Sequence, residues 1–376
     1  MAQYRLVEAQ PVVRGRGYAL SSSTGPGDPR VVKRLAAISA AMMLSACTPL
    51  MIQQAGAPPM GFQGPRLERD VFVSFDGTRL GLSRWEAQGE PKAVVVALHG
   101  MNDYANAFHL AAPYWAQNGV TTYAFDQRGF GRSPNRGIWG GDDLMVEDLR
   151  AITAVVRNQH PGVPVIVAGE SMGGAVAIEA FASDRPPAAD RLILMAPAVW
   201  GWSNQPLPYK TMLWLAARFT AGKVYEPPRW LTRRVKPTDN RDELIAMGRD
   251  PLMVWGARSD TLYGLVAMME RAWGAAGGIK VPTLYIYGAN DEIIPEEPSF
   301  EAAAKLKATD RSAYYAKGWH LMTRDHQGPV VWADLLSFIR DPQAPLPSGA
   351  PTIPGSPTLP NALIEAEGRV KAQVGL

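Results

Sequence analysis

The feature that most constrains the fold of this chain is an abrupt change from strand to helix within residues 163–182. The segment reads VPVIVAGESMGGAVAIEAFA, in which a continuous apolar run leads into GESMGG and then into a helix of small residues. Such a run is typical of a strand that is covered on both faces. Three glycines around Ser171 allow a tight turn, and the turn strains the serine backbone so that its hydroxyl is presented above a sheet. The segment therefore predicts an α/β fold with a nucleophilic Ser171 at the end of a strand.

The rest of residues 66–341 alternates between apolar runs and helical patterns. Strand patterns occur at 70–85 (two stretches around a turn), 93–100, 121–126, 163–169, 191–197, 282–288 and 311–316, and helix-like segments near 104–118, 143–159, 172–183, 298–307 and 328–340. Repeated β-α-β order predicts a mostly parallel eight-stranded sheet with helices on both faces. Ligands of such sheets bind beyond the carboxyl ends of the strands, so we look for the site there.

Two further side chains complete a catalytic pattern at those strand ends. A serine hydroxyl is a weak nucleophile that needs an adjacent base, which is itself held by a third group. The expected chain order is serine, acid, histidine. Asp291 follows the strand at 282–288 in YGANDEIIP, and His320 follows the strand at 311–316 in KGWHLMTRD. The sequence thus predicts a Ser171–His320–Asp291 triad.

Other residues are weaker candidates for these roles, and backbone donors are also needed. The weaker acids are Glu292, Asp260 and Asp325, the rival base is His326, and His109 and His160 are interpreted as structural. The oxyanion of an acyl-transfer intermediate needs N–H donors from the residue after the nucleophile and from the loop after the third strand. Those donors are predicted to be the amides of Met172 and Met101, with His99 shaping the loop.

These motifs together resemble a known family. LHGMND, FDQRGFGRS, GESMGG, YGANDEIIP and GWHLMTRD look like the α/β-hydrolases of the monoacylglycerol lipase and lysophospholipase group, also described as serine-aminopeptidase-like hydrolases. The resemblance covers about residues 68–341. It implies an α/β-hydrolase fold and a serine esterase that uses the triad and the two amides named above.

An insertion of about 80 residues, at about 200–280, follows the sixth strand. An insertion of this length is usually functional, and in the resembled lipases it forms a cap over an acyl pocket. Six of the eleven tryptophans lie in it: Trp200, Trp202, Trp214, Trp230, Trp255 and Trp273. Helical apolar spacing occurs at 209–222 and 260–273. We expect an aromatic and Met-rich roof over a lipid-like monoester, with simple packing of the tryptophans as the alternative.

The first 47 residues have the pattern of a secretory leader. Two cations precede an apolar stretch at 35–44, and LSAC follows at 44–47; this order is that of a signal sequence. It also resembles the bacterial lipobox, whose cysteine is diacylated and becomes the first mature residue. About ten apolar residues are too few to cross a bilayer, which takes roughly 20. We expect Cys47, the single cysteine, to carry a lipid anchor; the alternative is a buried helix with an incidental cysteine.

The leader also bears on location and on the start of the chain. Thr48 is not the aspartate associated with inner-membrane retention, so we expect an outer-membrane lipoprotein that faces the periplasm of a bacterial envelope. Because 30 residues precede the signal pattern, the true start is expected near Val31 or Val32, with residues 1–30 an over-extended reading frame. Residues 48–65 are expected to form a flexible tether, and the Pro-rich segment 342–376 a mostly disordered tail.

Charge and motif content exclude several classes of partner. The formal net charge is +3, but without the first 47 residues the chain has 32 basic and 33 acidic residues, and no basic stripe points to nucleic acid. No P-loop, dinucleotide fingerprint or metal-ligand spacing occurs, so no cofactor is expected. Two alternatives stay open. One is an amidase or aminopeptidase, with Glu170, Glu226 or Glu270 binding an amine, and the other is a non-catalytic binding lipoprotein. The oligomeric state is not predicted.

Overall fold

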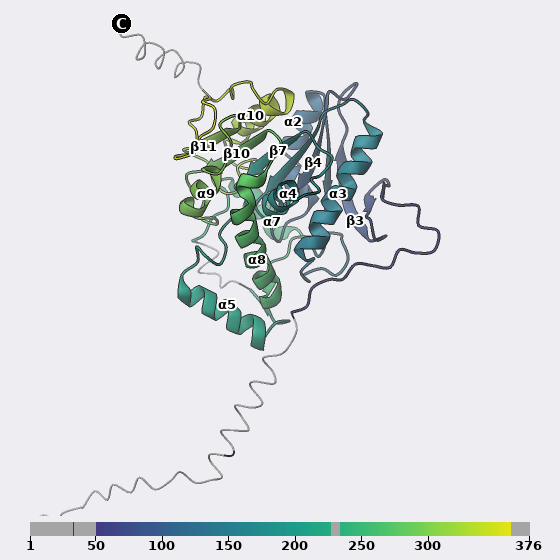
Figure 1. Cartoon of the computed structure of the whole chain (residues 1–376), viewed down its shortest axis with the longest axis vertical. Coiled ribbons are helices and arrows are strands. Elements are labelled where there is room, and N and C mark those ends of the chain that lie inside the picture. Colours follow the sequence, from purple (N-terminus) through teal and green to yellow (C-terminus); the bar gives the residue numbers. More distant parts are fainter. Residues whose placement is uncertain (1–32, 34–49, 227–233, 362–376) are drawn as a thin grey trace, which may run out of the picture. The chain divides into compact units, whose positions relative to one another are not determined.

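The computed structural model describes Lys33 and residues 50–226 and 234–361 of the chain. Apart from Lys33, the signal pattern lies outside these residues, as do Cys47 and Trp230. The described residues 50–226 and 234–361 belong to one compact unit, and the fold described below is that of this unit (Figure 1).

The unit is built on a nine-stranded sheet. Its strands are β1 (Arg66–Leu67), β2 (Val71–Val73), β3 (Arg79–Trp85), β4 (Ala93–Leu98), β5 (Val120–Phe125), β6 (Val165–Glu170), β7 (Arg191–Met195), β10 (Thr283–Gly288) and β11 (Arg311–Tyr315). They lie in the order β1-β2-β3-β5-β4-β6-β7-β10-β11. The first three are antiparallel to their neighbours and the other six are mutually parallel. The predicted mostly parallel sheet is confirmed; it has nine strands rather than eight because the two-residue β1 pairs with β2.

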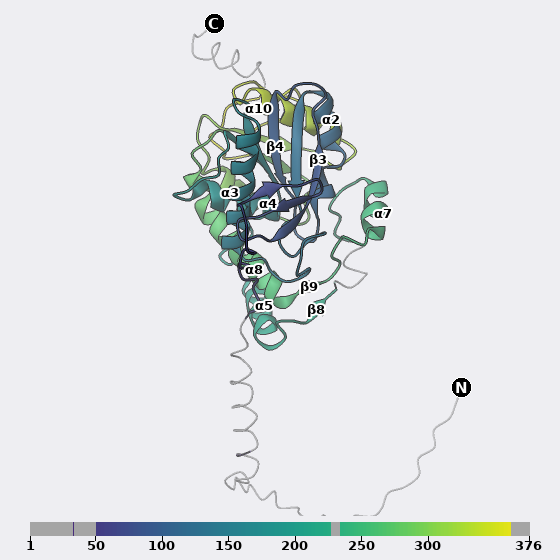
Figure 2. The ribbon, with the colours of Figure 1, turned by 90° about the vertical axis from the view of Figure 1, so that its right-hand side faces the viewer.

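Helices cover both faces of the sheet, as the apolar strands require. They are η1 (Ala105–Phe108), α2 (Ala111–Gln117), α3 (Asp142–Gln159), α4 (Met172–Ala182), α9 (Glu296–Ala303) and α10 (Gly328–Arg340). Helices α2 and α10 pack together in one layer, whereas α4 contacts α3 and α8 in the other (Figures 1 and 2). Every residue of β4, β5, β6 and β10 is buried, which is the expected result for parallel strands between two helical layers.

The predicted cap lies between β7 and β10. It contains α5 (Leu207–Phe219), β8 (Val224–Tyr225), α7 (Arg241–Arg249), β9 (Ala257–Arg258), α8 (Ser259–Ala275) and η2 (Ala276–Gly278), and β8 pairs with β9. Helix α8 packs on α4 of the body and also on α5. Helix α5 buries only Ala217, so it covers the body loosely. Within the described residues, no helix combines the length and apolar character needed to cross a membrane.

The first part of the predicted disordered tail is ordered, which corrects the expectation for 342–361. Ile353 is 1% exposed and belongs to the hydrophobic core. The Tyr314 amide donates to the Pro351 carbonyl (2.8 Å), and the Asn361 side-chain amide donates to the Ser312 carbonyl (2.7 Å). This segment thus covers the outer edge of β11, where unpaired backbone groups would otherwise face solvent. Residues 362–376 lie outside the described part.

The tether prediction needs a similar correction over residues 50–56. Ile52 forms a β-bridge with Trp139, and the Gln53 amide donates to the Trp139 carbonyl (2.9 Å). The Gly56 amide donates to an Asp76 carboxylate oxygen (2.8 Å). These contacts fix the segment against the body, because the Trp139 backbone and the Asp76 side chain satisfy its hydrogen bonds. Its Pro- and Gly-rich composition alone does not reveal them.

The packing of Ile353 generates a stability prediction. Replacing Ile353 by Ala should lower the free energy of unfolding by about 2–5 kcal/mol, because a buried side chain is removed from the core. Urea denaturation of the full-length protein measures the change. Ile245→Ala is the matched control: its side chain is 40% exposed, so a change within about 0.5 kcal/mol is expected. Equal effects at the two positions would show that the 342–361 segment contributes no core packing.

Candidate active site

Ser171 occupies the strained turn that the sequence predicts. It lies between β6 and α4 with φ 51° and ψ −117°, a conformation that is unfavourable for any residue with a side chain. The turn is held by close backbone packing: a Cβ built on Gly173 would lie 2.4 Å from the Leu98 carbonyl oxygen. Only glycine fits there, so α4 can begin directly against the end of β4.

The loop after β4 lies over Ser171. A Cβ on Gly100 would stand 3.1 Å from the Ser171 Cβ, so a side chain at this position would press on the serine. Within the described part of the chain, neither the Met101 amide nor the Met172 amide donates a hydrogen bond. Met172 is the first residue of α4, where backbone N–H groups have no partner within the helix and favour negative charge.

His99 holds this loop in place, as the sequence indicates. Its Nε2 accepts a hydrogen bond from the Gln127 amide (2.9 Å), which leaves Nδ1 to donate to the Gly100 carbonyl (2.8 Å). Burial lowers the pKa of the His99 imidazole, so the neutral ring is favoured. Both ring nitrogens are thus engaged by the backbone.

His320 and Asp291 are joined as the sequence predicts. The His320 Nδ1 donates to the Asp291 Oδ2 at 2.8 Å, and the Asp291 side chain is fully buried. The other Asp291 oxygen accepts from the amides of Ile293 (2.8 Å) and Ile294 (3.0 Å). Burial by itself lowers the pKa of the His320 imidazole, but the Asp291 charge and hydrogen bond, together with the Glu170 charge, outweigh it, so the pKa lies above its ordinary value.

The weaker acid candidates are engaged elsewhere. Glu292 accepts from the Lys236 amide (2.7 Å), and Asp260 forms an ion pair with Arg258. Asp325 is buried and accepts hydrogen bonds from the Trp319 amide and the Thr238 hydroxyl, both in or beside the loop of His320. Burial raises the pKa of Asp325 to about 6. None of these carboxylates replaces Asp291 at the imidazole.

The other histidines also have separate surroundings. His109 lies 3.3 Å from the Glu243 carboxylate, and His160 forms a hydrogen bond with the Tyr123 hydroxyl (2.9 Å). His326 is exposed, and its backbone amide donates to Asp239. The structural interpretation of the first two histidines therefore agrees with their contacts.

Ser171 and His320 line one cavity of about 530 Å³ between the body and the cap. Met101 and Asn102 of the loop after β4 also line it. Its apolar wall consists of Ala198, Met212, Leu213, Pro237, Met247, Met253, Leu262, Leu265, Val266, Met269, Ile293, Ile294 and Leu321, together with Trp200 and Tyr209. A cavity of this size with few polar groups is typical of a small-molecule site.

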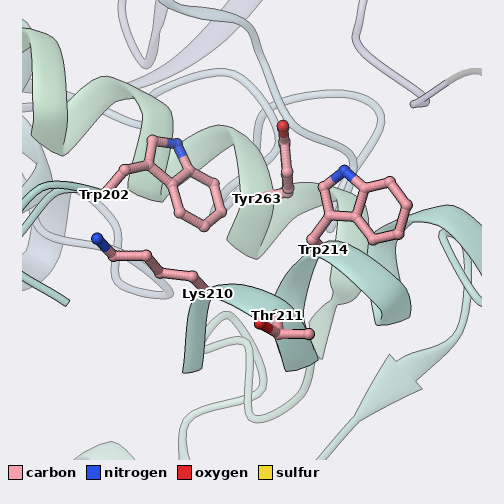
Figure 3. A pocket seen from close by; sticks show the side chains of 5 residues that line it. All are labelled: Trp202, Lys210, Thr211, Trp214 and Tyr263. Carbon is pink, nitrogen blue, oxygen red and sulfur yellow. The ribbon is translucent and has the colours of Figure 1, made fainter. Parts of the chain in front are cut away.

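The predicted aromatic roof is only partly present. Of the described tryptophans in the insertion, Trp200 lines the cavity, whereas Trp202 and Trp214 line a separate hollow of about 390 Å³ on the cap. In that hollow the two indole rings lie on either side of Tyr263, above Lys210 and Thr211 of α5 (Figure 3). The cavity itself is roofed mainly by methionine and leucine.

The other tryptophans of the insertion that the structure describes, Trp255 and Trp273, do not line the cavity. Trp255 is 50% exposed. Trp273 packs against Lys305, whose ammonium lies 3.8 Å from the ring centroid. These two residues fit the alternative of ordinary packing.

A buried charge cluster beside Ser171 was missed by the sequence reasoning. Arg324 is 2% exposed, and its guanidinium contacts Glu170 and Asp103, each at 2.7 Å. The sequence does hold a signal, because three of the motifs each contain a charged residue. Glu170 precedes Ser171, Asp103 lies in the loop after β4, and Arg324 follows His320 by four residues. Glu226 and Glu270, the other amine-binding candidates, do not line the cavity; Glu226 is exposed and Glu270 binds Ser203.

Among the described residues, no group of three or more His, Cys, Asp or Glu side chains is placed to hold a metal ion. The chemistry that the arrangement supports is nucleophilic attack by Ser171 with a buried imidazole as base.

Comparison with known proteins agrees with this geometry. Residues 89–327 match the family model described as "Serine aminopeptidase, S33". The chain is 26% identical over 281 residues to a monoacylglycerol lipase of Mycolicibacterium smegmatis, a match that covers 71% of this chain and 95% of that protein.

Solved structures share the fold. A monoacylglycerol lipase of Paleococcus ferrophilus superposes with a TM-score of 0.58 at 23% identity, covering 69% of this chain and 98% of that one. A soluble variant of the Saccharomyces cerevisiae monoglyceride lipase, solved with a substrate analog, gives 0.60 at 17% identity, covering 76% and 98%. At these identities the likeness establishes the α/β-hydrolase fold.

The contact of His320 with Asp291 generates a titration prediction. NMR titration should give a His320 pKa above the ordinary value of about 6.5 in the wild type and a lower pKa in Asp291→Asn, because that variant removes the stabilising charge but keeps the burial. Glu292→Gln is the control and should leave the pKa unchanged, since Glu292 binds the Lys236 amide instead. A His320 pKa that responds to Glu292→Gln and not to Asp291→Asn would assign the acid to Glu292.

Proposed function

The chain belongs to the serine aminopeptidase, S33, family and is a serine hydrolase of the α/β-hydrolase type. We propose that it hydrolyses the carboxylic ester bond of lipid-like monoesters, such as monoacylglycerol or lysophospholipid. The observation that carries the proposal is the apolar cavity of about 530 Å³ that holds both Ser171 and His320. Similarity to proteins named monoacylglycerol lipase supports the same substrate class.

The polar groups of the cavity support the following reaction. The Ser171 hydroxyl attacks the ester carbonyl while the His320 Nε2 takes its proton, and Asp291 holds the Nδ1 side of the ring. The Met101 and Met172 amides then stabilise the oxyanion of the tetrahedral intermediate. His320 returns the proton to the departing alcohol, which leaves an acyl-serine. Water repeats the sequence on this ester and releases the fatty acid.

The cavity wall favours an acyl chain over a polar substituent. Each buried CH₂ contributes roughly 0.8 kcal/mol, so an acyl chain of eight carbons would gain several kcal/mol along the methionine and leucine wall. The cap also exposes apolar side chains around its α5 helix, among them Leu207, Met212, Leu215 and Phe219. Such a surface suits an enzyme whose substrate resides in a lipid phase.

Peptide or amide hydrolysis is the second candidate, because the matching family model carries the name of an aminopeptidase. An aminopeptidase needs a polar or acidic pocket for the substrate's amine, and a free carboxylate would be its strongest partner. Among the described residues that line the cavity, the carboxylates are Asp103 and Glu170, and both bind Arg324. This pairing favours the ester. If an alanine p-nitroanilide were turned over faster than a p-nitrophenyl ester, amide hydrolysis would become the preferred function.

We further propose that Cys47 carries a diacylglycerol anchor that holds the enzyme at the outer membrane, facing the periplasm. The leader pattern and the lipobox LSAC support the anchor, and Thr48 supports the outer membrane. An anchored enzyme would meet lipid monoesters at high local concentration. The anchor and the substrate are thus mutually consistent, although each is tested separately.

Ser171→Ala should lower kcat/KM on p-nitrophenyl esters and on monoacylglycerol by at least about 10³-fold, because the nucleophile is removed. The detergent-solubilised full-length protein is assayed on chain lengths from C2 to C16, and medium or long chains should be preferred. Ser203→Ala, at an exposed serine of the cap, is the control and should retain wild-type rates. Equal turnover by the Ser171 variant would remove this serine from the mechanism, and activity on C2 alone would remove the lipid substrate.

The anchor is tested by metabolic labelling with palmitate in a bacterial host. Label should enter the wild-type protein and be absent from Cys47→Ala, because the thiol is the site of acylation. Sucrose-gradient fractionation should place the wild-type protein with outer membranes. Labelling that persists in the variant would eliminate the lipoprotein proposal and leave the esterase proposal intact.

A further inference from the structure

Three loops that meet around Ser171 are joined by one buried guanidinium. The Arg324 Nη2 donates to the Glu170 Oε1 (2.7 Å), and Glu170 directly precedes Ser171. The Arg324 Nη1 lies 2.7 Å from the Asp103 Oδ2, two residues after Met101 in the loop after β4. Arg324 itself follows His320 by four residues. A single side chain therefore contacts the loop of the nucleophile, the loop of the proposed oxyanion donor and the loop of the base.

Burial of these charges needs an explanation other than stability. Arg324, Glu170 and Asp103 are 2%, 1% and 5% exposed. Removing ions from water costs several kcal/mol each, and well-packed apolar residues in their place are often equally stable. A buried ion pair does, however, fix the relative position of its partners, and the planar guanidinium fork fixes two carboxylates at once. We therefore take the role of these ion pairs to be that they fix the relative positions of the three loops.

A second buried arginine shows what a purely structural cluster looks like. Arg128 is 1% exposed and donates through Nε, Nη1 and Nη2 to both oxygens of Asp76 and both oxygens of Asp148, with Thr78 as a further acceptor. Within the described residues it does not line the cavity. Arg324 is less saturated: its Nε and the Glu170 Oε2 are buried without a hydrogen-bond partner among the described groups. Unsatisfied buried groups of this kind need an explanation. Their position beside Ser171 and His320 suggests a role in the active site rather than in stability.

We propose that Arg324 is a positioning residue for ester hydrolysis, which holds the oxyanion loop, the nucleophile and the base in register through its anchors Asp103 and Glu170. A displacement of about 1 Å between reacting groups can cost about 10²-fold in rate. The inference rests on the proposed esterase function, but not on the lipid substrate. It is therefore tested on a soluble ester.

The same cluster acts on the charge of His320. The groups that face the imidazole are Asp291 after β10, Glu170 at the end of β6 and Arg324 in its own loop, with Asp103 across the guanidinium. Glu170 raises the pKa of His320 and Arg324 lowers it. Since the base must be neutral to accept a proton, loss of the Glu170 charge should move the acid limb of the kcat/KM profile to lower pH.

The test compares three variants of the detergent-solubilised full-length protein on p-nitrophenyl butyrate. Arg324→Lys keeps the charge but cannot span both anchors, so kcat should fall at least about 10-fold with KM changed less than about 3-fold and the acid limb in place. Glu170→Gln keeps an acceptor for Arg324 and should move the acid limb to lower pH. Arg128→Lys is the matched control, and it should lose thermal stability while its kcat per folded molecule and its pH profile stay at wild-type values.

Wild-type kcat in Arg324→Lys, or an equal loss of kcat in Arg128→Lys, would overturn the proposal. An unmoved acid limb in Glu170→Gln would overturn the action of the cluster on His320. If Arg324→Lys does not fold, the isosteric Glu170→Gln and Asp103→Asn replace it, with a lowered kcat expected for Asp103→Asn. A wild type that cleaves the butyrate and not monoacylglycerol would refute the lipid substrate while leaving this test valid.

Discussion

The close approach of α4 to the end of β4 is the constraint on which the site depends. The Gly173 backbone lies where any side chain would meet the Leu98 carbonyl, and this contact forces the chain to reverse over a single strained residue, Ser171. Strain of about 1–3 kcal/mol persists only where the surroundings determine the backbone; here they are the buried strand β6, the helix α4 and the loop at Gly100. The same packing directs the N-terminus of α4 and the loop after β4 toward one point. The proposed nucleophile and its proposed oxyanion donors therefore result from one packing event.

The site could be predicted from the sequence wherever its residues are tied to strand ends. Ser171, Asp291 and His320 each follow an apolar run, and parallel strands bring their carboxyl ends to one edge, so order along the chain implies proximity. The charges of the Arg324 cluster also lie near strand ends, but nothing in the local sequence shows that Arg324 pairs with Glu170, 154 positions away. The segments 50–56 and 342–361 were misjudged for a related reason. Composition reports the intrinsic freedom of the backbone, whereas their order comes from partners such as Trp139 and Ser312 in distant parts of the chain.

The number of tryptophans in the cap does not predict the lining of the cavity, because the direction of each side chain on its helix determines which residues face it. Tryptophans are concentrated in the insertion, yet the cavity is lined mostly by methionine and leucine. Helix α5 explains the difference: Tyr209, Met212 and Leu213 lie on the face toward the cavity, while Lys210 and Trp214 lie on the face toward the hollow of Figure 3. Residues three or four positions apart lie on one side of a helix, as Tyr209 does with Met212 and Leu213, and as Lys210 does with Trp214. Methionine, which is unbranched and adaptable, suits a wall that must accommodate a flexible chain.

Arg324 connects the geometry of the site with its choice of substrate. Asp103 and Glu170 are the carboxylates among the described residues of the cavity wall, and an unpaired buried carboxylate would attract an ammonium group or take up a proton. Both are bound to the same guanidinium, so neither is left without a cationic partner, although burial still raises the pKa of Glu170. The apolar surface then determines what enters. Under the proposed function, the side chain that aligns the three loops also removes the one feature that would recruit an amine. Selection for an ester with an apolar chain then follows from a structural pairing rather than from a dedicated specificity pocket.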